Sequence, residues 1–292
     1  MQFRLQEAVK GALNVLGLGS TVHDFRSRQK YQADLQARAR NARFLDQPAP
    51  DGLPMPPPEL VYLVTGQFDL EAFYNNGVLG AECIQAVLLR NGLDLNSVSA
   101  ILDFGCGCGR VLRHWKRLRV PKIYGVDYNP RLIEWCGRNL TFANFGVNRS
   151  KVPLDFSDAT FDFIYSISVF THLTEAAQRF WMDELIRVLK PGGHLLFSVH
   201  GVTRVNQLTP QQRAEFEAGN MVIVGSRYSG KNACGTYHPE RYVREVLCRD
   251  LEFVAFGPGA AKDAKQDTFL MRKFTGDLRG QSPRGKGDKT LR

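Results

Sequence analysis

Three glycines at alternate positions follow an apolar run in the segment ILDFGCGCGR, residues 101–110. Gly105, Gly107 and Gly109 carry no side chain, so the backbone amides of this turn can approach a ligand closely. A helix that begins just after such a turn adds the positive end of its dipole, and the combination binds a carboxylate or a phosphate. A dinucleotide-binding turn of the GxGxxG type would place its third glycine at position 110, where Arg110 stands.

A carboxylate follows at the end of the next apolar run. Asp127 lies in YGVDYNP, 22 residues after Gly105. An unshared carboxylate at the end of a strand can accept hydrogen bonds from two vicinal hydroxyl groups. The glycine turn and Asp127 therefore predict two anchoring points for one ligand, the first for an anion and the second for a diol.

The glycine segment resembles the first motif of the class I S-adenosylmethionine-dependent methyltransferases, and Asp127 stands where that family has an acid after its second strand. Residues 161–173, FDFIYSISVFTHL, resemble the family's fourth-strand motif, and residues 187–197, RVLKPGGHLLF, resemble its turn from helix to fifth strand. The resemblance covers about residues 70–275. It implies S-adenosylmethionine as cofactor, with its methionine portion at the glycine turn and its ribose hydroxyls at Asp127.

The resemblance also implies a set of cofactor-binding residues, and it leaves alternatives open at some of them. Asp103 either contacts the cofactor or only braces the glycine turn, and Tyr128 either flanks the adenosine or packs against the core. The expected set is Asp103, Gly105, Cys106, Gly107, Gly109, Asp127, Tyr128, Asn148 and Ser166.

The chain departs from the family near the third strand. Many members offer an aspartate there to the adenine amino group, whereas this chain has Asn148, which can still accept a hydrogen bond. Asp155 and Asp158 are the fallback candidates, although their setting in LDFSDATFD is more typical of a solvated turn.

Two histidines are the candidates for catalysis. A sulfonium methyl group is already electrophilic, so alignment of the reacting atoms supplies much of the acceleration, and a base is needed only for a nucleophile that holds its proton tightly. His172 and His200 are expected at the carboxyl ends of the fourth and fifth strands, where open parallel sheets bind ligands. The alternative for each is a structural histidine, and His238, before Pro239, is interpreted as a helix cap.

The six cysteines show no CxxC spacing, and we predict no metal site. Cys106 and Cys108 are interpreted as small side chains that fill the glycine turn. Reduced thiols, together with the lack of a signal-peptide pattern and of a 20-residue apolar run, predict a cytoplasmic protein with no transmembrane segment.

From residue 97 onward, short apolar runs alternate with helical patterns. This alternation predicts a Rossmann-like α/β fold, a doubly wound and mostly parallel seven-stranded sheet with an N-terminal helical extension. The expected strands are residues 100–104, 123–127, 142–148, 161–168, 195–200, 252–256 and 268–274, and the expected helices are 109–119, 130–140, 174–190, one after Pro210, and 239–249.

Composition shifts along the chain predict four regions. Residues 1–47 form a helical extension, 48–60 a Pro-rich linker, 61–276 the methyltransferase domain with a substrate-side insertion at 201–237, and 277–292 a disordered basic tail. The apolar positions of the extension can pack on the core, pair two copies into a homodimer, or contact a membrane surface peripherally. Residues 67–79, with Asn75, Asn76 and Gly77 as a hinge, are expected to fold over the cofactor as a lid.

The net charge of +9 lies at the two ends of the chain. Residues 1–47 carry 8 Lys and Arg against 4 Asp and Glu, residues 272–292 carry 7 against 2, and the remainder is balanced. A neutral core offers no evident groove for nucleic acid, so we expect a methyl acceptor that is a small molecule or a glycan, methylated on oxygen or nitrogen. The alternatives are an RNA or DNA methyltransferase and a non-catalytic module that binds a cofactor or a partner.

Overall fold

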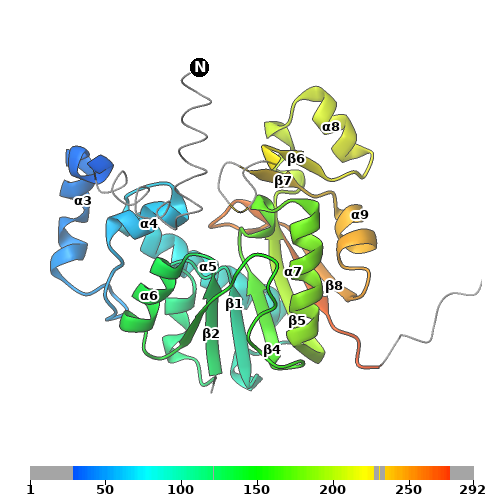
Figure 1. Cartoon of the computed structure of the whole chain (residues 1–292), viewed down its shortest axis with the longest axis horizontal. Helices are drawn as coiled ribbons and strands as arrows, with labels where there is room; N and C mark the ends of the chain where they lie inside the picture. Colours follow the sequence, from blue (N-terminus) through cyan, green and yellow to red (C-terminus); the bar gives the residue numbers. More distant parts are fainter. Residues whose placement is uncertain (1–28, 121, 227–229, 231–233, 277–292) are drawn as a thin grey trace, which may run out of the picture.

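In the computed structural model, which describes residues 29–276 except 121, 227–229 and 231–233, one seven-stranded sheet organises the chain. The strands are β1 (Ala100–Phe104), β2 (Lys122–Asp127), β3 (Asn144–Val147), β4 (Phe161–Ser166), β5 (Leu189–Val199), β8 (Glu252–Ala261) and β9 (Gln266–Arg272). Their order is β3-β2-β1-β4-β5-β9-β8, and of these seven only β9 points in the opposite direction to the rest. The predicted doubly wound, mostly parallel sheet is therefore confirmed (Figure 1).

Helices cover both faces of this sheet. Helix α7 (Glu175–Val188) packs on one face, together with α9 (Glu240–Tyr242) and the π-helical turn that continues it, Val243–Leu247. Helix α5 (Leu70–Arg90), helix α6 (Pro130–Asn139) and the 3₁₀ helix η2 (Leu112–Arg117) pack on the other. Apolar residues alternate between the two faces along β1. Leu102 lies in the hydrophobic core on the α7 side of the sheet, and Ile101 lies in the core on the α5 side.

The N-terminal part of the described chain packs on the core. Helix α3 (Leu35–Asp46) lies against the start of α5, where the buried Asn41 side chain accepts from the backbone N–H of Leu70 and donates to the carbonyl of Phe68. This contact agrees with the packing alternative for residues 29–47. The expected apolar face over residues 3–16 lies outside the described residues, as does the basic tail, 277–292.

The Pro-rich segment 48–60 is held against the core rather than spanning open solvent. Ala49, Leu53 and Met55 are buried, and the last residues of the segment already belong to helix α4 (Pro58–Thr65), with Pro58 in its first turn. The anchor is Arg113, which is fully buried and bonds both carboxylate oxygens of Asp51 at 2.6 and 3.0 Å. A buried guanidinium needs this pairing, because an unpaired charge is expensive to desolvate.

Two sequence-based expectations are wrong. Residues 70–79 form the first part of α5 rather than a lid. Gly77 is an ordinary residue of this helix, and position 77 takes glycine because a side chain there would collide with the backbone carbonyl of Arg110. The helix expected at 109–119 is the shorter 3₁₀ helix η2, Leu112–Arg117. It cannot include Gly109, whose φ of +77° lies outside the right-handed helical region.

The insertion 201–237 forms a small subdomain beyond the end of β5. It contains the 3₁₀ helix η4 (Val202–Gln207) and the α-helix α8 (Pro210–Glu217), which was expected after Pro210. The paired strands β6 (Val222–Val224) and β7 (Gly235–Tyr237) complete it. Its own core is Leu208, Phe216, Val222 and Tyr237. Figure 1 shows it above the sheet, beside the edge where β4 and β5 end, and a bridge between His200 and Tyr237 ties it to that edge.

The remaining elements are short. The 3₁₀ helices η1 (Leu95–Ser97) and η3 (Phe170–His172) lead into β1 and follow β4. No helix in the described part of the chain is both long and apolar enough to cross a membrane.

Candidate active site at the carboxyl ends of β1, β2 and β4

The strand order changes direction between β1 and β4. From β1 the chain builds outward to β2 and β3 and then returns to the other side of β1 with β4. Open α/β sheets bind ligands outside the carboxyl ends of the strands at such a switch point. The glycine turn after β1 and the turn that carries His172 after β4 meet at this place.

The glycine turn is folded back over β2. The backbone N–H groups of Gly105 and Cys106 both donate to the carbonyl of Val126, at 2.8 and 3.0 Å. Gly105 has a φ of +85°, and a Cβ atom there would lie 2.2 Å from the Cγ2 atom of Val169. Gly105 therefore fits both the left-handed backbone and the close approach of the β4 turn, which only glycine tolerates.

Asp127 joins the second strand to the glycine turn. Its carboxylate accepts the N–H of Gly107 at 3.0 Å and the N–H of Asn129 at 2.9 Å, one on each oxygen. Each oxygen keeps a further lone pair, so the carboxylate can still accept from two hydroxyl groups. Burial raises the pKa of Asp127 to about 6. Hydrogen bonds from backbone amides favour the ionised form and partly offset this rise.

The loop after β3 lies next to Asp127, since the N–H of Asn148 donates to the Asp127 carbonyl at 3.1 Å. The side-chain oxygen of Asn148 is buried and has no hydrogen-bond partner among the described residues. Tyr128 follows Asp127 and is 60% exposed, so its ring is accessible to a ligand. The contacts of Tyr128 and Asn148 with a cofactor stay predictions.

Asp103 braces the sheet. Its carboxylate accepts the hydroxyl of Tyr165 at 2.8 Å, and that hydroxyl in turn accepts the indole N–H of Trp115 at 2.8 Å. All three side chains are buried, and burial raises the pKa of Asp103 to about 7. The bracing alternative is thus present in the structure, and direct contact of Asp103 with a cofactor stays a prediction.

The thiols beside the turn are buried. Cys106 and Cys136 both place their sulfur 3.6 Å from the carbonyl oxygen of Gly107, and Cys108 is fully buried nearby. Burial raises the pKa of Cys106 and of Cys108 well above the ordinary value, so both remain neutral thiols at neutral pH. Within the described ranges, no three His, Cys, Asp or Glu side chains come together as metal ligands would.

Ser166 ends β4 at the same edge. Its side chain is completely buried, and its hydroxyl has no hydrogen-bond partner in the described part of the chain. A buried hydroxyl without a partner is unusual in a protein and suits a site that a ligand completes.

The two candidate histidines are neighbours. The rings of His172 and His200 lie 6.2 Å apart at 89°, and the ring of His200 also contacts Tyr237 at 5.1 Å. Burial lowers the pKa of His172, and burial with the nearby positive charge of Arg204 lowers the pKa of His200 to about 3. Both imidazoles are therefore neutral at neutral pH.

His238 does not cap the following helix, since Pro239 is the N-cap of α9 and no side chain among the described residues bonds to its first turn. It is 1% exposed, and its Nε2 atom lies 2.9 Å from the side-chain oxygen of Gln178. Burial lowers the pKa of His238 to about 3, so this histidine is also neutral. Its partner Gln178, like Cys234 and Thr236 around the His172 turn, was not expected from the sequence, because contacts over about 60 residues leave no local pattern.

Arg110, which follows the glycine turn, forms an ion pair that holds the turn in place. Its guanidinium bonds the Asp263 carboxylate at 2.7 Å, and Asp263 lies in the hairpin between β8 and β9. The glycine turn is therefore tied at its end to the far edge of the sheet.

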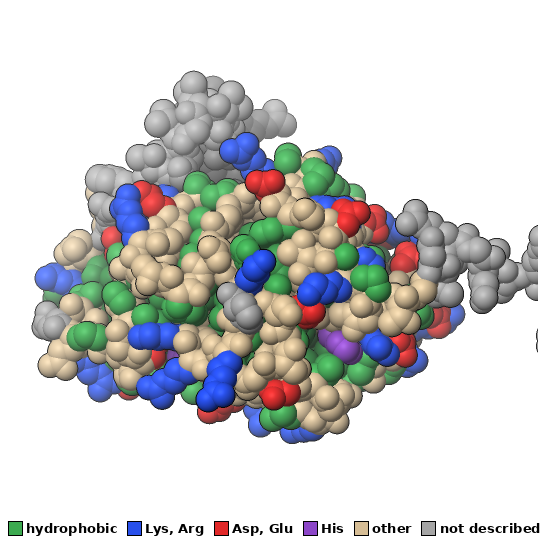
Figure 2. Space-filling model, turned by 90° about the horizontal axis from the view of Figure 1, so that it is seen from below, with side chains coloured by type: hydrophobic (Ala, Val, Ile, Leu, Met, Phe, Trp, Pro, Cys, Tyr) green, Lys and Arg blue, Asp and Glu red, His purple; other side chains and the backbone are tan. Residues whose placement is uncertain are grey.

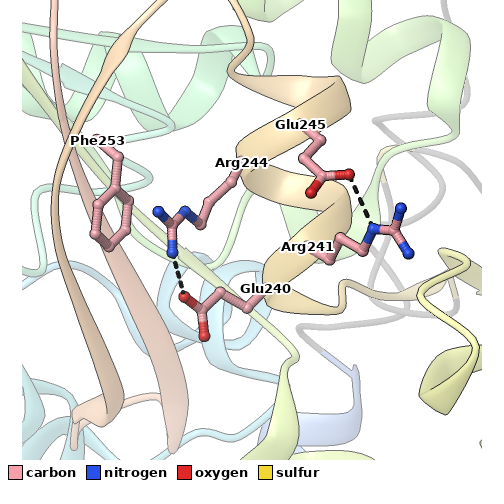
Figure 3. A pocket seen from close by; sticks show the side chains of 5 residues that line it. All are labelled: Glu240, Arg241, Arg244, Glu245 and Phe253. Atoms are coloured by element: carbon pink, nitrogen blue, oxygen red, sulfur yellow. Dashed lines mark hydrogen bonds and ion pairs between the residues drawn. The ribbon is translucent and has the colours of Figure 1, made fainter.

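A separate hollow lies on the outer surface between α9 and β8 (Figure 3). Its charged side chains pair with each other, Arg244 with Glu240 at 3.1 Å and Arg241 with Glu245 at 2.9 Å. The guanidinium of Arg244 also lies 4.0 Å from the centre of the Phe253 ring. Exposed pairs of this kind contribute little to stability, and the hollow presents no group suited to catalysis.

The residues at the sheet edge fit S-adenosylmethionine. The glycine turn follows β1 and lies beside Asp127, which offers acceptors for a diol. Asn148 and Ser166 add buried polar atoms that the described protein leaves without partners. A ligand with an amino-acid end, a sugar and a base matches these groups in kind.

Comparison with known proteins gives the same assignment. The family model described as a methyltransferase domain matches residues 102–197. A sterol 24-C-methyltransferase of Yarrowia lipolytica is 28% identical over 57% of this chain and 42% of its own length. The protein named "Probable tRNA methyltransferase 9B" of Homo sapiens is 31% identical over 49% of this chain and 31% of its own length.

A solved structure described as an S-adenosylmethionine dependent methyltransferase, from Mesorhizobium loti, shares the fold with a TM-score of 0.50. It is 15% identical, and the likeness covers 66% of this chain and all of that one. The chain spans less than half the length of the curated relatives named above. Its residues 102–197, set in this sheet, belong to the methyltransferase domains of the class I, S-adenosylmethionine-dependent type.

Proposed function

We propose that the protein transfers a methyl group from S-adenosylmethionine to an oxygen or nitrogen atom of a small-molecule or glycan-type acceptor. The observation that carries the proposal is the union of the glycine turn with Asp127 through the Gly107 N–H. This contact holds the glycine turn and the proposed diol-binding carboxylate at a fixed separation, as one extended ligand requires.

Each group has a distinct task in this proposal. The glycine turn receives the methionine portion, and Asp127 holds the ribose hydroxyls. The sulfonium, when bound, supplies an electrophilic methyl group. The neutral His172 at the end of β4 takes a proton from the acceptor, and the insertion 201–237 forms a wall of the acceptor site.

Binding and turnover test the proposal separately. Calorimetric titration with S-adenosylmethionine and with S-adenosylhomocysteine should show one saturable site. Incubation with methyl-labelled donor and fractionated extracts should then label an acceptor. Binding without labelling of any fraction would favour the non-catalytic alternative, and absence of binding would remove the proposal.

A tRNA acceptor is the second candidate, because one of the relatives carries the name of a tRNA methyltransferase. Figure 2 shows the face opposite the insertion, where Lys and Arg side chains lie between acidic and neutral ones rather than forming one continuous basic surface. Binding of RNA that weakens steeply as salt rises, and labelling of an RNA fraction, would support this candidate over a small acceptor.

A cytoplasmic location, a homodimer through the N-terminal helices and peripheral membrane contact are further parts of the proposal. Reduced thiols agree with the first, since the described cysteines are unpaired. The packing of α3 on α5 leaves the exposed Leu35 and Leu45 available for the other two.

A further inference from the structure

The turn that carries His172 is adjacent to the donor side of the site. Val169, which contacts Gly105 closely, accepts the N–H of His172 through its backbone carbonyl at 2.9 Å. The 3₁₀ turn from Val169 to His172 therefore connects the glycine turn with the histidine. A shift of this turn would move His172 relative to a donor bound at the glycine turn.

The tautomer of His172 is set by its surroundings. Its Nδ1 atom lies 2.7 Å from the backbone carbonyl oxygen of Cys234, which can only accept. Nδ1 therefore carries the proton, and Nε2 of the neutral ring keeps its lone pair as a proton acceptor. His200 has no such arrangement, because its Nδ1 atom is buried without a hydrogen-bond partner among the described residues.

Gln178 holds the His172 turn from helix α7. Its side-chain amide donates to the carbonyls of Phe170 and Leu173, at 3.2 and 3.0 Å, which lie on either side of the turn. The Leu173 carbonyl accepts a second hydrogen bond at 2.8 Å from the hydroxyl of Thr236 in β7. Gln178 and Thr236 are both completely buried, so water does not replace these bonds easily.

His238 completes the arrangement by fixing Gln178. Since both amide hydrogens of Gln178 point at carbonyls, its oxygen is the acceptor and Nε2–H of His238 is the donor, at 2.9 Å. The orientation of the Gln178 amide is thereby determined. The insertion contributes Cys234 and Thr236, and α7 contributes Gln178, so the turn is held from two independent elements.

We propose that Gln178, Thr236 and His238 are positioning residues that hold His172 as a neutral proton acceptor, and that the acceptor group is a hydroxyl. The inference rests on the proposed function. In the step, the acceptor oxygen bonds to the methyl carbon, the carbon–sulfur bond breaks with its electron pair on sulfur, and the hydroxyl proton moves to Nε2 of His172. A hydroxyl requires this, because it is a weak nucleophile while it keeps its proton.

Nuclear magnetic resonance of the full chain with ¹⁵N-labelled histidine tests the positioning. His172→Gln assigns the His172 signals by removing them. We expect the Nδ1–H tautomer in the wild type and a mixture with Nε2–H in Gln178→Met and in Thr236→Val. Gln211→Ala, a matched glutamine on the exposed face of α8, should leave the tautomer unchanged.

Turnover of a hydroxyl acceptor found in the labelling screen gives the second readout. Gln178→Met and Thr236→Val should lower kcat by about 10-fold to 10²-fold and leave the donor's dissociation constant unchanged. A small displacement of the His172 ring slows the chemical step but removes no contact with the donor. A wild-type Nε2–H tautomer, or an unchanged tautomer in Thr236→Val, which preserves side-chain volume, overturns the inference. A wild type that binds no donor overturns the proposed function instead, whatever the tautomer.

Discussion

The donor side and the acceptor side of the site are built in different ways. On the donor side, the glycine turn and Asp127 come from two consecutive strands and are joined by backbone amides. On the acceptor side, His172 depends on Cys234, Gln178 and Thr236, and the residues that bond to one another there are up to 63 positions apart. The comparison shows that binding groups can be made locally, whereas the orientation of a reacting side chain depends on distant packing.

The largest expected effect concerns the Pro-rich segment 48–60, which Arg113 anchors to the core. Arg113→Ala removes the fully buried guanidinium, leaves the partly buried Asp51 without its partner and frees the carbonyls of Leu53 and Pro54. We expect a loss of about 3 to 5 kcal/mol in the free energy of unfolding, as for other broken buried ion pairs. Denaturant titration measures it, and Arg117→Ala, on the exposed side of the same 3₁₀ helix, should change stability little. Equal effects of both substitutions would show that the ion pair does not anchor the segment.

Asp127→Ala separates the two sides. Loss of hydrogen bonds from two hydroxyls to a carboxylate should weaken donor binding by about 1 to 3 kcal/mol, which calorimetric titration measures. The tautomer of His172 should not change, because Asp127 bonds only to the donor side. Asp183→Ala, an exposed aspartate on α7, serves as the control. Undiminished affinity in Asp127→Ala would exclude this carboxylate from the site.

The pH dependence of donor binding follows from the raised pKa of Asp127. With a pKa of about 6, the carboxylate is mostly ionised near neutral pH and mostly protonated at about pH 5, so donor affinity should fall about tenfold between these values. Folding stability changes in the opposite sense. The contribution of Asp127 is fully present below the model-peptide value of 3.8 and is lost as the pH rises through about 6.

Titrations of binding and of unfolding across this range measure both slopes. Asp103, with a pKa raised to about 7 by burial, adds to the stability slope in the same sense. The Asp127→Ala protein should lose the pH dependence of binding over this interval. A dependence that persists in that variant would assign the titration to another group.

The smallest effect is expected at the C-terminus. Removal of residues 277–292 should leave the melting temperature and the donor affinity nearly unchanged, because their sequence, rich in Gly, Lys and Arg, has few of the apolar residues that a packed segment needs. Thermal unfolding and calorimetry of the shortened chain check this. A large drop in either quantity would make the tail part of the fold.

Much of the fold could be predicted from the sequence. The bounds of β1 and the ends of α6 and α7 agree with the expected elements within two residues, since apolar periodicity and capping residues such as Asn129 act locally. The prediction of a lid was wrong because a glycine in a sequence suggests a hinge. The actual reason for Gly77, its close packing against the Arg110 carbonyl, depends on a contact that the sequence does not show. The Pro-rich segment was expected as a linker because Arg113, which anchors it, lies more than 50 positions away.

The sequence by itself determined the proposed donor-binding groups of this protein, because glycines that permit a tight turn and an acid at a strand end act through their own backbone positions. Only the tertiary structure decided which histidine keeps a free lone pair, since the proton on a neutral imidazole follows the hydrogen-bond partner that packing supplies. It also decided that Asp103 braces the sheet, because the hydroxyl of Tyr165 reaches it from the neighbouring strand.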